Sequence, residues 1–158
     1  MQTVALHLCE LAEQVRGVTL RMLEDVPAAW QRWAPAGTSN HILWHAGHVL
    51  WVQDILAIEP LTGRTELPAG WAETFGMDCR PVRETTQWPS LDEIVSHLSD
   101  QLPRLFECFA HANPEQLLDM TAPAEGWNLP RGIIHGLHDE ARHQGEIHLL
   151  KKMCRAAS

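Results

Sequence analysis

Residues 132–154, GIIHGLHDEARHQGEIHLLKKMC, decide how the rest of the chain is interpreted. The stretch is long enough for about six turns of α-helix, and Pro130 suits the first turn of such a helix. Asp139 and His143 are four residues apart, so a helix projects both side chains from one face. That face continues as an apolar stripe through Ile147, Leu150 and Cys154. A carboxylate and an imidazole directed into a core must be paired or metal-bound, because their burial is otherwise costly.

A second histidine-rich segment, NHILWHAGHVLWVQDIL at residues 40–56, is apolar almost all round and is predicted to form a core helix. A divalent transition metal with an open coordination position is typically held by three protein groups. The stretch above supplies two of them, and this segment is expected to supply the third. His48 is the better candidate because it shares a helical face with Trp44 and Trp51. His45 is the alternative, about 60° around the helix.

His138 precedes Asp139 but projects about 100° away from it on a helix. We therefore expect His138 to be exposed or to lie just outside the metal ligands. The pattern also allows an interpretation without metal, in which the buried histidines are satisfied by hydrogen bonds to one another.

Periodicity predicts a first helix over residues 3–25. Its buried face is expected to carry Val4, Leu8, Leu11, Val15, Val18 and Met22. Arg16 is expected on the surface. The second helix is predicted from Thr38 or Ser39 to Ile58, with Thr38, Ser39 or Asn40 as the N-cap and Pro60 marking its end.

A third helix begins at Ser90, which forms a capping-box pattern with Glu93. A short helix follows Asn113, and residues 61–89 are predicted to be a long irregular connection that borders a site. These elements predict an all-α, four-helix bundle with a long crossover connection between helices two and three. Residues 1–158 are expected to form one domain.

Composition excludes several classes of function. The chain has a net charge of −8 and no cluster of lysines and arginines, which argues against nucleic-acid binding. No apolar run is long enough to span a membrane, and no signal peptide is visible, so a cytoplasmic location is expected. The four scattered cysteines, Cys9, Cys79, Cys108 and Cys154, are expected to be free, packed thiols.

The segments WHAGHVLWVQD (44–54) and HDEARHQGEI (138–147) resemble the DinB/YfiT-like superfamily of bacterial metal-binding four-helix bundles. The resemblance continues through GTSNHILWHAGH (37–48) and WPSLDEI (88–94). The run from His143 to Glu146 is similar to the family's His-Arg-Gly-Gln, and GHVLW (47–51) is similar to the Gly-His-Leu-Ala-Trp around a metal-binding histidine.

This resemblance implies a divalent metal held by His48, Asp139 and His143, often in a homodimer. Most relatives have a second histidine where this chain has Asp139, whereas mycothiol-dependent maleylpyruvate isomerases resemble it in having a carboxylate there. A mixed site of this kind is expected to accept Zn, Ni, Fe or Mn.

The family's activities imply an enzyme that activates a low-molecular-weight thiol, such as bacillithiol or mycothiol, for attack on an electrophilic substrate. Metal-dependent hydrolysis is the nearest variant. A binding or stress-response protein with a structural metal is the alternative.

Overall fold

Apolar side chains that recur every three or four residues place most of this chain in helices. The computed structural model describes residues 3–37, 40–77, 88–121 and 126–157, and every regular element in those ranges is helical. The prediction of an all-α protein is therefore confirmed. Within the same ranges, no helix combines the length and the hydropathy needed to cross a bilayer.

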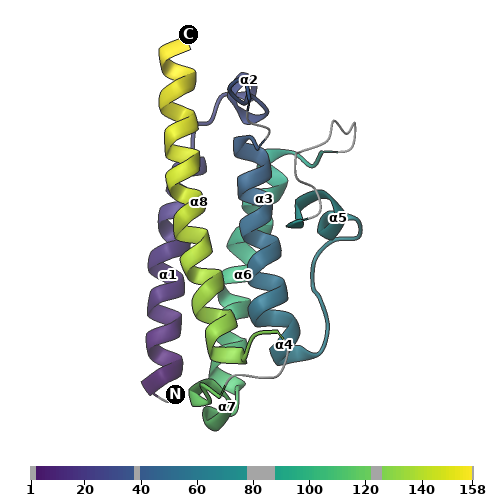
Figure 1. Ribbon diagram of the computed structural model, residues 1–158, viewed down its shortest axis with the longest axis vertical. Coiled ribbons are helices and arrows are strands. Elements are labelled where there is room, and N and C mark those ends of the chain that lie inside the picture. The colour runs from purple at the N-terminus through teal and green to yellow at the C-terminus, as the bar shows by residue number, and fades with distance from the viewer. Residues whose placement is uncertain (1–2, 38–39, 78–87, 122–125, 158) are drawn as a thin grey trace.

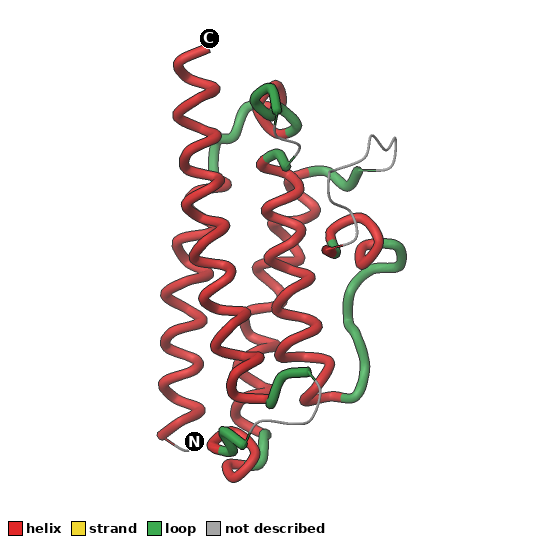
Figure 2. The backbone as a smooth tube through the Cα atoms, in the orientation of Figure 1, coloured by secondary structure: helices red, strands yellow, loops and turns green. Residues whose placement is uncertain are grey.

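Among the residues that the structure describes, four helical segments are long. They are α1 (Thr3–Leu23), α6 (Leu91–His111), α8 (Leu129–Ala157) and a continuous run composed of α3 (Ile42–Gln53), the π-helical turn η1 (Asp54–Ile58) and α4 (Glu59–Thr62). The short helices are α2 (Ala28–Gln31), α5 (Trp71–Phe75) and α7 (Pro114–Leu118). The long segments lie side by side along the longest axis of the molecule, and helices dominate the path of the chain (Figures 1 and 2). α1 and α3 each pack against both α6 and α8.

The start of α3 differs from the prediction. Asn40 is not the N-cap, because the side chain of His41 accepts a hydrogen bond from the backbone N–H of Trp44 at 3.1 Å. Thr38 and Ser39 lie outside the described residues. Burial, followed by the positive charge of Arg32, lowers the pKa of His41 to about 4. A neutral imidazole keeps the lone pair that this cap requires.

The end of the same segment also corrects the prediction. The helical run does not end at Pro60 but continues to Thr62. The π-helical turn interrupts the α-helical ladder, and Pro60 then falls in the first turn of α4. Proline is tolerated there because its missing N–H would have no partner within the helix.

α1 buries a different face from the predicted one. The predicted residues lie at the edge of the interface or in solvent, and Leu11 is 40% exposed. The buried side chains come one position later, at Ala5, Cys9, Ala12, Arg16, Thr19 and Leu23. Arg16 was expected on the surface, yet it is only 1% exposed. Its guanidinium is buried because Glu140 of α8 lies opposite, 2.8 Å from Arg16 Nε.

The helices predicted to begin at Ser90 and after Asn113 are capped by these two residues. Ser90 accepts the N–H of Glu93 at 3.1 Å at the start of α6, and Asn113 accepts the N–H of Glu115 at 3.0 Å at the start of α7. Cys9, Cys108 and Cys154 are buried thiols outside any disulfide, in agreement with the prediction, and Cys79 lies outside the described residues.

The connection from residue 61 to residue 89 is less irregular than predicted, because α4 extends into it and α5 lies within it. Asp54 of the π-helical turn is buried and accepts hydrogen bonds from the hydroxyl of Thr65 and, at 2.9 Å, from the N–H of Glu66. These bonds hold the chain that leaves α4 against the helix that bears the histidines. Residues 78–87 of the connection lie outside the described ranges.

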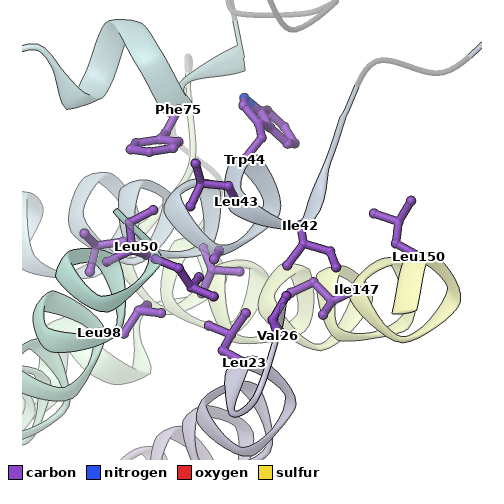
Figure 3. Packing of buried hydrophobic residues seen from close by; sticks show 14 of the residues in the cluster. Leu23, Val26, Ile42, Leu43, Trp44, Leu50, Phe75, Leu98, Ile147 and Leu150 are labelled. Carbon is purple, nitrogen blue, oxygen red and sulfur yellow. The ribbon is translucent and has the colours of Figure 1, made fainter. Parts of the chain in front are cut away.

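The core on the α5 side gathers apolar side chains from most of the elements (Figure 3). Its labelled members are Leu23, Val26, Ile42, Leu43, Trp44, Leu50, Phe75, Leu98, Ile147 and Leu150. Phe75 is fully buried against α3. A side chain at Gly47 would place its Cβ 2.2 Å from the Phe75 ring, so glycine at this position lets α5 approach α3 closely.

Candidate metal centre

Asp139 and His143 lie one helical turn apart on α8, and both side chains are buried, at 8% and 6% exposure. Ile147, Leu150 and Cys154 continue the same buried face. The core-facing stripe predicted for residues 132–154 is therefore confirmed. His138 and His148 are exposed, in agreement with the expectation for His138.

His48 of α3 meets this pair from the facing helix. Asp139 Oδ2 lies 3.2 Å from His143 Nε2 and 3.6 Å from His48 Nε2. One ligand atom from each of the three residues can be chosen so that all lie within 4.8 Å of one another. The structure thus brings together the three residues that the sequence nominated.

The donor set fits a divalent transition metal. Two ligand atoms at about 2.1 Å from a tetrahedrally coordinated ion are about 3.4 Å apart, close to the separations of the Asp139 carboxylate from the two imidazoles. Two nitrogen donors and one oxygen donor also match the composition of sites that keep a position open for water or substrate.

Each candidate imidazole is held through its other ring nitrogen. His48 Nδ1 lies 2.6 Å from the carbonyl oxygen of Phe75, and His143 Nδ1 lies 2.7 Å from His45 Nδ1. Such partners orient metal-binding histidines in known sites. His45, the alternative third ligand, thus presents its Nδ1 to His143, while His48 is the histidine of α3 that approaches Asp139.

Electrostatics favours a charged carboxylate in the absence of metal. Burial alone would raise the pKa of Asp139, but the hydrogen bond and the charge of His143, together with the charges of His48 and His135, outweigh it. The pKa of Asp139 is therefore lowered, and the group is ready to act as an anionic ligand. Arg142 Nη1, 3.4 Å from Asp139 Oδ1, adds a cation at the rim.

A cavity of about 700 Å³ opens over the three residues. Trp51, Ile55 and Leu149 contribute apolar walls, and Arg142 and Glu146 contribute charge. Trp127, which is 57% exposed, and His135 also line the cavity, and the centroids of their rings lie 4.4 Å apart. A volume of this size accommodates a small organic molecule.

Sequence reasoning missed several parts of this centre. The Phe75 carbonyl lies in a segment predicted to be irregular, and its approach depends on α5. His135 and Arg142 were not singled out, although their spacing from Asp139 along α8 places them near it. No local signal marks Glu140, which lies next to Asp139 but faces Arg16.

Comparison with known proteins agrees with this picture of the fold. The crystal structure of a conserved protein from Enterococcus faecalis is 19% identical to this chain, and the two match over 96% of each chain with a TM-score of 0.63. That similarity concerns the fold alone. A search of curated proteins finds no match. The family profile described as DinB superfamily matches residues 11–147, which is most of the chain. The chain therefore belongs to the DinB superfamily.

Proposed function

We propose that this protein is a divalent-metal-dependent enzyme in which His48, Asp139 and His143 hold the ion. The observation that carries the proposal is the convergence of the three groups on the floor of a cavity large enough for a small substrate. Three protein ligands leave room for a further ligand, as in catalytic rather than structural sites. Zn, Ni, Fe and Mn are all compatible with this donor set.

A bound ion would lower the pKa of a thiol or a water molecule and so supply a nucleophile at neutral pH. His48 and His143 would orient toward the ion through Nε2, because their Nδ1 atoms are engaged by Phe75 and His45. Asp139 would contribute the negative charge. The apolar walls, including Trp51 and Ile55, would limit the water around the reacting groups.

Transfer of a small-molecule thiol to an electrophilic substrate is the reaction that we favour, and hydrolysis is its nearest variant. Arg142 is the one arginine or lysine among the described residues that line the cavity. Together with the apolar walls, this cation supports a substrate or thiol that is partly apolar and carries an anionic group. A non-catalytic metal-binding or stress-response protein is the second candidate, and a coordinatively saturated ion would favour it.

We further propose that the four long segments form a four-helix bundle, with the connection between α4 and α6 as its crossover. A single domain, a homodimer and a cytoplasmic location complete the proposal. The dimer rests on the family resemblance, and light scattering of the purified protein tests it.

The decisive experiment is metal content by inductively coupled plasma mass spectrometry. Untagged wild type and His48→Ala are purified without chelator, with His138→Ala as the matched control because His138 is exposed. We expect about one ion per chain in wild type and in the control, and nearly none in His48→Ala. Absence of metal from wild type, even after loading with each of the four ions, would contradict the proposal.

A further inference from the structure

His45 and His143 form a buried imidazole pair in which the two Nδ1 atoms lie 2.7 Å apart. A neutral imidazole has one N–H and one lone pair. In a hydrogen bond between two neutral rings, one Nδ1 must therefore carry the proton and the other must accept it. The ring that donates through Nδ1 has no proton on Nε2. The ring that accepts through Nδ1 has its proton on Nε2.

His48 does not have this choice. Its Nδ1 lies 2.6 Å from the carbonyl oxygen of Phe75, and a carbonyl only accepts. Neutral His48 therefore carries its proton on Nδ1, which leaves a lone pair on the Nε2 atom that faces Asp139. This histidine is set for metal coordination before any ion arrives.

His143 faces two different demands. Without metal, its Nε2 lies 3.2 Å from the carboxylate of Asp139, which favours a proton on Nε2 and requires Nδ1 to accept from His45. Coordination through Nε2 exchanges the proton and the lone pair of this ring, because Nε2 must then offer its lone pair to the ion. The proton of His143 must move to Nδ1, and His45 must accept it.

We propose that His45 is a positioning residue for the metal centre, whose Nδ1 donates to His143 without metal and accepts from His143 when metal is bound. The protons balance with both rings neutral throughout. His143 releases its Nε2 proton to water and gains the Nδ1 proton of His45, and His45 takes a proton from water at Nε2. Water can reach the pair through the cavity, which both rings line. The inference rests on the metal site proposed above.

Long-range proton–nitrogen NMR of protein with ¹⁵N-labelled histidine reads these tautomers directly. At pH 8, above the ordinary imidazole pKa of about 6.5, spectra are compared without metal and with Zn²⁺. We expect the His143 proton on Nε2 without zinc and on Nδ1 with zinc, the reverse exchange in His45, and no change in His48. Loss of individual signals in His45→Asn, His48→Asn and His143→Asn assigns them.

Two substitutions test the positioning role through zinc affinity, measured by competition with a chromophoric chelator. His45→Leu removes the acceptor, and we expect a 10–100-fold loss of affinity. His45→Asn keeps a carbonyl that can accept from His143 Nδ1, so its affinity should return to within a few-fold of wild type. Exposed His138→Asn is the control, and cooperative unfolding confirms that each variant is folded.

The outcomes separate this inference from the proposed function. If wild type binds zinc but His143 carries its proton on the same nitrogen in both states, the switch is wrong and the metal site stands. Unchanged affinity in folded His45→Leu, or an equal loss in His45→Leu and His45→Asn, would also overturn the role of His45. If wild type binds neither zinc nor any of nickel, iron and manganese, both proposals are wrong.

Discussion

Asp139 and Glu140 are adjacent carboxylates on α8, and both are buried, at 8% and 1% exposure. Their surroundings differ because neighbouring residues on a helix project about 100° apart. Asp139 borders the cavity and meets two imidazoles. Glu140 enters the interior between the long helices and accepts four hydrogen bonds, from Arg16 Nε at 2.8 Å, Arg16 Nη2 at 3.1 Å, Thr19 Oγ1 at 2.7 Å and Gln53 Nε2 at 3.2 Å.

Glu140 is a structural carboxylate, whereas Asp139 is one that can bind a ligand. Each oxygen of Glu140 accepts two hydrogen bonds, so the acceptor capacity of this group is filled by protein. Arg16 continues the network to α6 through the carbonyl of Leu98 and the side chain of Gln101, so the four long segments are joined. Asp139 has fewer protein donors and a cavity beside it, which leaves it able to accept an ion.

The largest expected effect comes from Glu140→Gln, which keeps the shape of the side chain and removes its charge. The substitution leaves Arg16 buried without its counter-ion, and we expect a loss of about 3–5 kcal/mol in the free energy of unfolding, measured in urea. The exposed pair of Glu66 and Arg104 provides the control, since Glu66→Gln should cost at most about 1 kcal/mol. Equal effects of the two substitutions would remove the distinction between the sites.

Asp139→Asn removes the charge of the neighbouring carboxylate, the one that borders the cavity. We expect zinc affinity to fall by at least about 100-fold. Asp139 is itself a proposed ligand, and its loss should cost more than the loss of a residue that only contacts a ligand. The stability of the metal-free protein should change by no more than about 1 kcal/mol, because an amide oxygen can still accept from His143. A metal-free protein destabilised as much as Glu140→Gln would mean that Asp139 is chiefly structural.

A smaller loss of stability is expected from Gly47→Ala, which affects the Phe75 contact beside the metal centre and leaves the Glu140 network intact. The new methyl group would meet the ring of Phe75, and relieving the overlap should cost about 1–3 kcal/mol. Movement of Phe75 also shifts the carbonyl that holds His48, so zinc affinity should fall as well.

Gly145→Ala is the matched control, because a Cβ at Gly145 meets open space on an exposed part of α8. It should stabilise the protein by about 0.5–1 kcal/mol and leave zinc affinity unchanged. Normal zinc affinity in Gly47→Ala would show that the α5 contact does not orient His48.

The smallest effect concerns the cation beside Asp139. We expect Arg142→Gln to weaken binding of the anionic dye 8-anilinonaphthalene-1-sulfonate by about two- to fivefold. The effect is small because solvent screens the charge of this exposed side chain. The uncharged counterpart of this dye, N-phenyl-1-naphthylamine, should bind equally to both proteins, and fluorescence titration measures both affinities. Arg131→Gln, exposed on the same helix, is the control. Equal weakening of the two dyes would indicate that Arg142 contributes packing rather than charge.

The sequence predicts the buried face of α8 correctly and that of α1 wrongly. On α8 the polar and apolar positions of the stripe are distinct, and the predicted face is the buried one. On α1 two neighbouring rows of side chains could face the core, and the periodicity predicts burial of the row with the larger apolar residues. The structure instead buries the next row, which includes Ala5, Ala12 and Arg16. The choice depends on a partner for Arg16 that lies 124 residues away in the chain.

The amino-acid sequence alone is enough to predict that α8 is a helix and that Asp139 and His143 share one of its faces. These properties follow from backbone hydrogen bonds and side-chain periodicity within a few residues. The packing of the helices against one another brings His48 to Asp139 and His45 to His143. The same packing encloses Glu140 between Arg16, Thr19 and Gln53. Such pairings depend on the rotation of each helix about its axis, which is settled when all the helices bury their faces together.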